Sequence, residues 1–405
     1  MTRLSTNLTL AYSCLAHAYT HMFILLYATV VLVLEREWGL TFSELQWLSV
    51  PGFVMFGVAA LPAGWLGDKW SSPGMMAVMF IGLGVASFVV GLAEGTTGIL
   101  VGLTLIGTFA AIYHPVGIPW LMKNAENPSR SLGLNGVFGS GGTAIAAITA
   151  GALADYWTWR AAFMVPGTIS FITGVAFLWS MKVGHIVEAE QDRKPQPQSS
   201  AGDMKRAFMV LAFTVVCTGM IFQSTSVSLP KIFDERLTSW LTGDGGEISA
   251  IGIGGFVSIA YACAAFAQII GGELAERYNL KWVYLLSQLV QVPILLLAWA
   301  SHSPVLIVLA ALMVSMNVLG QPAENTLLGR YTPLAWRARV FGAKFVLTLG
   351  ISSLGVMMVP VLHKMNGNLD FLFFIMAGFA GTAGLIAMLL PSHKQSPVQV
   401  AEPAE

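Results

Sequence analysis

Long apolar stretches alternate with short polar and charged clusters along the whole chain. A helix that crosses about 30 Å of hydrocarbon needs about 20 mainly apolar residues. Twelve stretches reach that length, at residues 8–34, 45–66, 73–93, 98–120, 132–154, 160–182, 207–230, 249–271, 281–300, 304–328, 338–362 and 369–390. The pattern therefore predicts an all-α membrane protein with twelve transmembrane helices and no soluble domain.

The composition supports a chain that faces lipid. Hydrophobic residues make up 55% and charged residues 10%, whereas soluble proteins carry about 25% charged residues. The 21 basic and 21 acidic residues cancel, which argues against nucleic-acid binding through bulk positive charge. The lipid bilayer is the expected partner, and no nucleic acid is expected.

Lysine and arginine positions predict the orientation, because cytoplasmic loops carry an excess of both. If the N-terminus is cytoplasmic, fifteen of the 21 basic residues lie in inside segments, five lie outside, and Lys344 lies within a span. Both termini are therefore predicted to be cytoplasmic, in a multi-pass protein of the plasma (inner) membrane.

The longest polar stretch divides the spans into two groups of six. Its proline, glutamine, serine and charged residues are typical of a flexible linker. The predicted organisation is a six-helix bundle over residues 1–182, a cytoplasmic linker over 183–206, a second six-helix bundle over 207–391 and a cytoplasmic tail over 392–405.

The two halves repeat the same features at an offset of about 207 residues. The segment 64–69 (GWLGDK) falls on 272–277 (GELAER), and His114-Pro115 falls on Gln321-Pro322. An acid–base pair and a helix-kinking proline at one offset indicate two homologous bundles. Parallel repeats of this kind place a substrate site between the bundles, near the membrane midplane.

Three segments resemble the major facilitator superfamily of transporters. Residues 64–70 (GWLGDKW) are similar to its signature in the loop after span two, and 272–278 (GELAERY) to the second, weaker copy. Residues 159–163 (WRAAF) match a common start of span six. The resemblance implies two pseudo-symmetric six-helix bundles around a cavity lined by spans one, four, seven and ten.

A narrower likeness comes from His17 and His21 in span one, from 110–117 (AAIYHPVG) and from 132–142 (LGLNGVFGSGG). These segments resemble the branch of the family that contains fosmidomycin-resistance-type efflux pumps.

Histidines are the main candidates for a site in the first half. His17 and His21 are four residues apart, so they share one helix face near mid-membrane, and His114 and Tyr19 add polar groups in the cavity-lining spans. Histidine titrates near neutrality, so these side chains could carry a coupling proton or bind an anionic substrate. Alternatively, they are neutral and hydrogen-bond to neighbouring helices. No metal is expected, because no ligating carboxylate or thiolate is evident nearby. No cofactor is expected either, and the proton gradient is the expected driving force for transport.

Gln321, Glu324 and Lys344 are the candidates in the second half. Spans ten and eleven run in opposite directions around one turn, so Glu324 and Lys344 reach a comparable depth. An ion pair between them avoids two isolated buried charges. There are four alternatives for these two residues. They form a static ion pair, or Lys344 snorkels to the interface, or the pair breaks as the cavity opens, or one of them is a proton site.

Charged residues at the span ends are candidates for gating: Asp68, Lys69, Arg130, Glu276, Arg277 and Arg337. The resemblance implies that Asp68 caps the start of span eleven near Arg337, and that Glu276 caps span five near Arg130. An acid at a helix N-terminus stabilises it by about 0.3–1 kcal/mol. The alternative is solvated loop charges.

The sequence predicts a secondary transporter that works by alternating access. No nucleophile–base pair or nucleotide loop is found, so an enzyme is not expected. Proton-coupled efflux of a small amphipathic or anionic molecule by a monomer is the leading interpretation. Uptake of an organic anion by proton symport is the alternative, and a non-transporting sensor or assembly factor is the alternative from another class.

Overall fold

The computed structural model describes residues 3–186, 201–243, 246–332 and 337–391. The described residues are helical, without strands, and form twelve segments long and apolar enough to cross a membrane. The predicted all-α fold with twelve transmembrane helices is confirmed.

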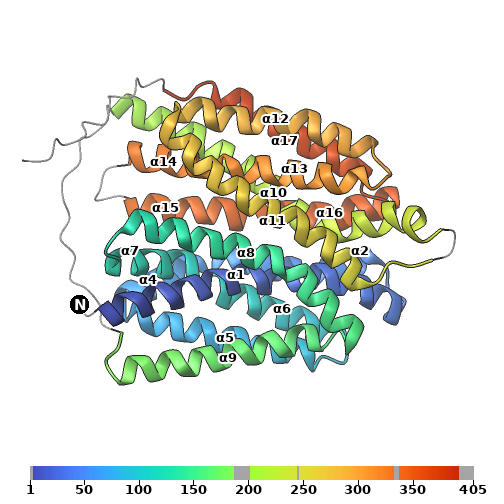
Figure 1. Ribbon diagram of the computed structural model, residues 1–405, viewed down its shortest axis with the longest axis horizontal. Helices are drawn as coiled ribbons and strands as arrows, with labels where there is room; N and C mark the ends of the chain where they lie inside the picture. Colours follow the sequence, from blue (N-terminus) through green and yellow to red (C-terminus); the bar gives the residue numbers. More distant parts are fainter. Residues whose placement is uncertain (1–2, 187–200, 244–245, 333–336, 392–405) are drawn as a thin grey trace, which may run out of the picture.

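The first six spans form one bundle and the last six form another, and Figure 1 shows the two bundles as its lower and upper halves. The first contains α1 (Arg3–Trp38), α2 (Phe42–Trp47), α3 (Val50–Val58), α4 (Ala60–Lys69), α5 (Ser72–Gly91), α6 (Thr96–Ala110), the π-helix η1 (Tyr113–Gly117), α7 (Ile118–Asn124), α8 (Pro128–Tyr156) and α9 (Ala161–Lys182). The second contains α10 (Ala201–Thr242), α11 (Ala250–Arg277), α12 (Leu280–Ala300), α13 (Val305–Leu319), α14 (Gln321–Tyr331), α15 (Arg337–Phe345), the π-helix η3 (Val346–Gly350), the 3-10 turn η4 (Ile351–Ser353), α16 (Leu354–Asn366) and α17 (Asp370–Ala387).

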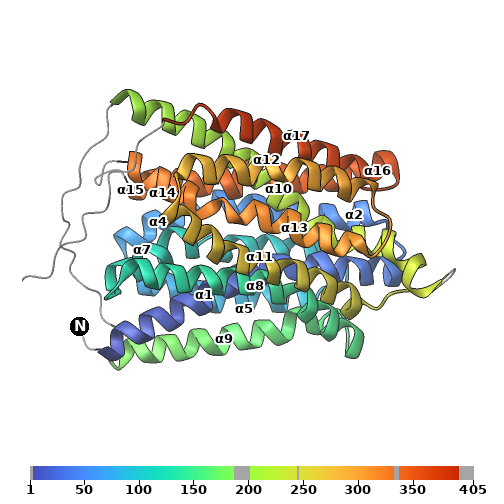
Figure 2. The same cartoon turned by 45° about the horizontal axis from the view of Figure 1, so that its top comes forward.

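The helices run roughly alongside one another, so the molecule has two ends. The end at which α1 begins, at the left of Figure 1, is the Arg3 end, and the opposite one is the Trp38 end. Turning the molecule by 45° leaves the same two ends apart (Figure 2). The Arg3 end is the one predicted to be cytoplasmic.

The contact between the bundles repeats the internal symmetry. Span five (α8) packs along span eight (α11), and span two (α2 and α3) packs along span eleven (η3 and α16). Glycines allow the backbones to meet: a Cβ on Gly57 would lie 2.1 Å from Cα of Gly350, and a Cβ on Gly151 would lie 2.3 Å from the carbonyl oxygen of Ala250. Larger side chains at these positions would force the bundles apart.

Helix breaks occur where the paired prolines predict them. Span four changes from α6 to η1 around Pro115, and span ten breaks at Gly320, immediately before Gln321-Pro322. A further break, which the sequence analysis missed, lies in span eleven at η3 and η4. It has no proline and falls where Gly350 contacts Gly57.

The predicted bounds of span seven are wrong. The helix α10 starts at Ala201 and ends at Thr242, well beyond the expected 207–230. The predicted span stops just before the charged residues from Lys231 to Arg236, but these are paired within the structure and the helix continues past them. Of the predicted linker 183–206, residues 201–206 belong to α10 and 187–200 lie outside the described residues, as does the tail 392–405.

Candidate functional site

The structure brings together the three histidines of the first bundle. Nε2 of His17 lies 3.2 Å from Nε2 of His21, one turn later on α1. His114, on η1, has its ring centroid 5.4 Å from both of theirs. At about 1.5 Å per residue, His17 and His21 lie about 21 and 27 Å from the start of a helix about 54 Å long. The cluster therefore lies near the middle of α1, and its depth in the membrane remains a prediction.

His17 is held in one orientation by α8 and η1. Its Nδ1 lies 2.8 Å from the carbonyl oxygen of Asn135, and its ring stacks on Tyr113 with centroids 4.8 Å apart. The Tyr113 hydroxyl donates to Oδ1 of Asn135 at 2.7 Å. Because a carbonyl only accepts hydrogen bonds, Nδ1 of His17 carries the hydrogen and Nε2 presents its lone pair. The sequence analysis did not identify the buried Asn135. The only feature in the sequence that points to it is a single amide side chain within a glycine-rich span.

Gly139 provides the space for the His17 ring. A Cβ at this position would lie 2.5 Å from Cε1 and Nε2 of His17. One turn on, Gly142 meets the backbone of Ala18, where a Cβ would lie 2.1 Å from its carbonyl oxygen. Close packing of α1 on α8 thus positions the histidine.

Tyr19 lies away from the cluster, which corrects its expected place in the site. Its hydroxyl is 3.2 Å from Oγ1 of Thr173 on α9, and its ring packs edge-on against Phe23 and Phe80. The reason is helical geometry: residues 17 and 21 share a face, and a residue two positions along projects to nearly the opposite side. Tyr19 joins α1 to the interior of its own bundle.

His114 is the member of the cluster that faces the second bundle. It is buried, and its ring lies 4.7 Å from the ring of Phe345, at the end of α15. Its Nδ1 has no hydrogen-bond partner within the described part of the chain. A buried polar atom without a partner costs free energy, so this nitrogen is available to a ligand or a proton.

Glu324 and Lys344 form the ion pair predicted from the sequence. Nζ of Lys344 lies 2.6 Å from Oε1 of Glu324, and their side chains are 10% and 4% exposed, in that order. Lys344 also donates to Oδ1 of Asn325 at 2.5 Å. Since Phe345 contacts His114, the ion pair of the second bundle lies beside the histidines of the first.

Gln321 is connected to the first bundle by a relay through Gln268, which the sequence analysis did not identify. Nε2 of Gln268 donates to Oε1 of Gln321 at 3.4 Å, and Oγ of Ser140 donates to Oε1 of Gln268 at 2.5 Å. These polar groups come from α14, α11 and α8. They place a hydrogen-bonded chain across the interface between the bundles.

At the Trp38 end, ion pairs join the two bundles. Lys231 lies 2.8 Å from Glu35, and Arg36 lies 3.1 Å from Asp234 and 3.2 Å from Glu247. These three ion pairs tie α1 to α10 and to the segment before α11. In the sequence, these residues are visible as charge clusters after spans one and seven. Only the packing of the helices shows that the two clusters pair with each other.

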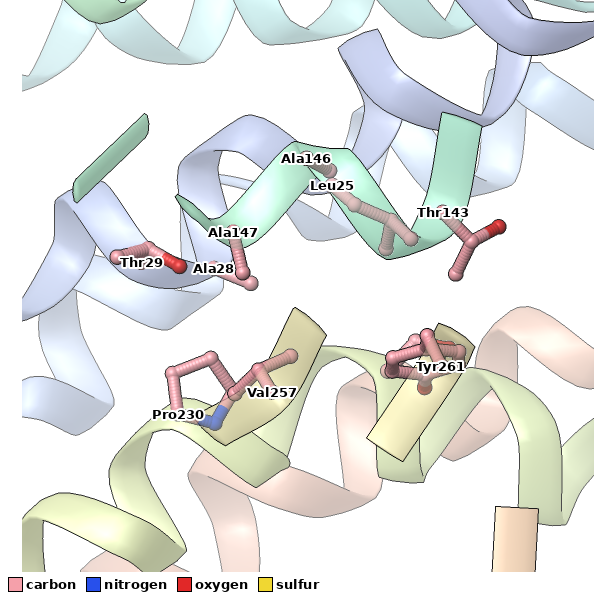
Figure 3. A pocket seen from close by; sticks show the side chains of 10 residues that line it. Leu25, Ala28, Thr29, Thr143, Ala146, Ala147, Pro230, Val257 and Tyr261 are labelled. Carbon is pink, nitrogen blue, oxygen red and sulfur yellow. The ribbon is translucent and has the colours of Figure 1, made fainter. Parts of the chain in front are cut away.

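A small pocket lies between the bundles (Figure 3), and its α1 residues follow His21 in the direction of Trp38. Leu25 and Thr29 of α1 line it on one side, and Pro230 and Tyr261 line it on the other. Its volume is about 10 Å³, at the lower limit for a single water molecule. The bundles are thus closed together on this side of the cluster.

Five of the six gating candidates are exposed at the Arg3 end: Asp68, Lys69, Arg130, Glu276 and Arg277. The helix that carries Asp68 packs against α15, but the Arg337 side chain lies outside the described residues. Arg277 pairs with Glu273, one turn earlier. The start of α8 is capped by Asn127, which accepts from the amide of Arg130 at 3.1 Å. The capping roles of Asp68 and Glu276 remain predictions.

Comparison with known proteins gives one family and a common fold. The sequence profile of the Major Facilitator Superfamily matches residues 13–259 and 211–405. Solved structures that resemble the chain include an inward-facing bacterial homologue of the human lysosomal transporter Spinster, at 14% identity and TM-score 0.73 over 96% of this chain and 95% of that one. A peptide transporter (POT) mutant bound to sulfate gives 15% identity and TM-score 0.74 over 94% and 93%.

Two curated relatives are each 25% identical over part of the chain. The puromycin resistance protein pur8 of Streptomyces alboniger aligns over 34% of this chain and 28% of its own length. The tetracenomycin C resistance and export protein of Streptomyces glaucescens aligns over 46% and 35%. The chain therefore spans about a third of the length of these relatives.

Proposed function

Since this chain belongs to the Major Facilitator Superfamily of membrane transporters, we propose that it exports a small amphipathic or anionic molecule by alternating access, coupled to proton entry. One observation carries the proposal. The buried His114 of the first bundle contacts Phe345 of the second, and Phe345 is next in sequence to Lys344 of the buried ion pair. A substrate between the bundles would touch both groups.

The histidines are the proposed coupling site. Acids of the first bundle lie in loops or at span ends: Glu35, Glu37, Glu44, Asp68, Glu94, Glu126 and Asp155. His17, His21 and His114 are its deep titratable groups, and histidine is the side chain best suited to gain and lose a proton in a transport cycle. Nε2 of His17 and Nε2 of His21 already share one hydrogen, so the added proton would bind Nδ1 of His114, which has no partner among the described residues.

Alternating access also needs an interface that opens and closes. Ion pairs and the tight pocket close the bundles together at the Trp38 end. Such partly exposed ion pairs are weak enough to exchange for water during a cycle. We propose that they act as the outer gate and that the substrate enters from the Arg3 end.

Export, as opposed to uptake, is proposed from the relatives, which are named for resistance and export. The segments around His17, His114 and Gly139 resemble fosmidomycin-resistance-type efflux pumps. This likeness also supports export. Puromycin is accordingly one of the compounds with which to test the protein.

The test begins with expression in an antibiotic-susceptible bacterium. Growth is measured against a panel of amphipathic antibiotics that includes puromycin, and on single organic acids as carbon sources. We expect the protein to raise the inhibitory concentration of at least one compound. Improved growth on an organic acid, with no change in resistance, would replace export with uptake by symport.

Coupling is then measured in proteoliposomes with an imposed pH gradient and the compound found in the growth assay. His21→Ala should abolish gradient-driven accumulation and leave downhill exchange of preloaded substrate partly intact. His302→Ala, which changes an exposed histidine, is the matched control. Full gradient-driven transport by both His17→Gln and His21→Gln would make the histidines packing residues, and Glu324 would be the remaining deep proton site.

A further inference from the structure

The three histidines of the first bundle converge on one point. One ring nitrogen from each of His17, His21 and His114 lies within 4.8 Å of the other two. We propose that these three side chains bind one divalent transition-metal ion such as Zn²⁺ or Co²⁺. The inference concerns binding alone and does not depend on proton coupling or on the direction of transport.

The distance between the first two nitrogens fits a shared metal ion. Histidine nitrogens bind zinc at about 2.0–2.1 Å, so two ligands of a tetrahedral ion lie about 3.3 Å apart. The Nε2 atoms of His17 and His21 are 3.2 Å apart. Both can therefore become ligands with almost no movement of α1.

His17 is already prepared as a ligand. A metal-bound histidine almost always donates its other ring N–H to a carbonyl or carboxylate, which fixes its tautomer. Nδ1 of His17 makes this bond to the carbonyl of Asn135 at 2.8 Å, and the ring is clamped between Tyr113 and Gly139. At His21, metal binding replaces the hydrogen bond to His17, and the proton on its Nε2 moves to Nδ1.

His114 supplies the third ligand. It has a buried ring nitrogen without a partner among the described residues. Its donor atom has to close by roughly 1.5 Å to reach tetrahedral spacing. It lies on the π-helix η1, beside Pro115, and π-helical turns inside α-helices are frequent at functional sites.

The ligand set selects the type of ion. Imidazole nitrogens favour zinc, copper, cobalt or nickel, whereas magnesium and calcium require oxygen ligands. The sequence analysis expected no metal because no carboxylate or thiolate was evident, but three histidines are a sufficient set for a site with one open position. Glu324 neutralises the neighbouring Lys344, so the site does not face an unpaired positive charge.

The experiment uses the full-length protein in detergent, with any polyhistidine tag removed. Co²⁺ is titrated and followed by its visible absorption, Zn²⁺ binding is measured by calorimetry, and the melting temperature is recorded with and without Zn²⁺. We expect one ion per chain, a higher melting temperature with Zn²⁺, and a loss of affinity of at least about tenfold in each of His17→Ala, His21→Ala and His114→Ala.

Two controls decide the location of the ion. His302→Ala removes an exposed histidine and Cys14→Ser removes the nearest thiol contact of Asn135; both should bind as the unmodified chain does. Equal binding by the unmodified chain and by the variant lacking all three histidines would overturn the proposal. No stoichiometric binding by the unmodified chain would overturn it as well, without affecting the proposed transport function.

Discussion

Nζ of Lys231 lies 2.8 Å from Oε2 of Glu35, and this ion pair joins the two bundles at the Trp38 end. Lys231 also lies 3.8 Å from both Asp234 and Glu235 on its own helix. The side chains of Lys231 and Glu35 are 10% and 28% exposed. The pair is thus intermediate between an exposed ion pair, worth about 0–1 kcal/mol, and a buried one, whose disruption costs about 3–5 kcal/mol.

Glu35→Gln is expected to loosen the closure at the Trp38 end. We expect a shift of about 1–2 kcal/mol towards the open state, which is about 5- to 30-fold in its population. The measurement is the labelling rate of a single cysteine at Thr29, which lines the interbundle pocket. Glu37→Gln, a neighbouring exposed acid, should leave that rate unchanged. Equal labelling in both variants would exclude the gating role.

Glu324 and Lys344 should depend on each other. Replacing one partner alone leaves a buried charge unpaired, at a cost of about 3–5 kcal/mol, so Glu324→Gln and Lys344→Met should each lower the melting temperature and the yield. The double variant should recover both. If it is no more stable than the worse single variant, the pair does not act as a unit. Recovered folding without transport would identify a working ion pair.

Gly139→Ala should disturb the histidine cluster without unfolding the protein. The added Cβ would lie 2.5 Å from the His17 ring, and overpacking of this kind costs about 1–3 kcal/mol. We expect gradient-driven transport to fall. Gly141→Ala, on the same helix with open space around its Cα, should keep full transport and unchanged or higher stability. Loss of transport in both variants would show that any substitution in α8 impairs transport, and that the effect of Gly139→Ala is not specific to the His17 ring.

Asp68→Asn tests the proposed latch at the Arg3 end. If Asp68 caps span eleven, the variant should insert normally and transport more slowly, because the closure at this end is weakened. The measurement is initial transport rate, together with cysteine accessibility at Gly136, which has open space around it. Glu126→Gln changes another exposed acid at this end and serves as the control. Unchanged rate and accessibility would make Asp68 a bystander.

The orientation of the chain is a separate prediction. A cytoplasmic reporter fused after Pro197, in the predicted linker, should be active, and a periplasmic reporter at the same position should be inactive. The opposite result would invert the assignment of the Arg3 end as the cytoplasmic end.

The sequence by itself determined the spans, because burying apolar residues in lipid requires about 20 of them in one run, a local property of the chain. It also predicted the breaks at His114-Pro115 and Gln321-Pro322, since proline removes a backbone donor whatever surrounds it. The pair of Glu324 and Lys344 followed from the cost of an isolated buried charge. Each of these inferences needs only the residues and their depth.

Only the tertiary structure decided which groups meet across helices. Asn135 holds His17 because α8 packs against α1 at Gly139 and Gly142, and nothing in the local pattern marks that amide. Helical geometry turns Tyr19 away from His17 and His21, but only the packing of α9 on that face of α1 gives its hydroxyl Thr173 as a partner. The charges of α10 looked like the end of a span, since the residues that neutralise them, such as Glu35 and Asp370, are distant in the sequence. A partner that is distant in the sequence lowers the free energy of a buried charge. The hydrophobic pattern along a single segment contains no information about such a partner.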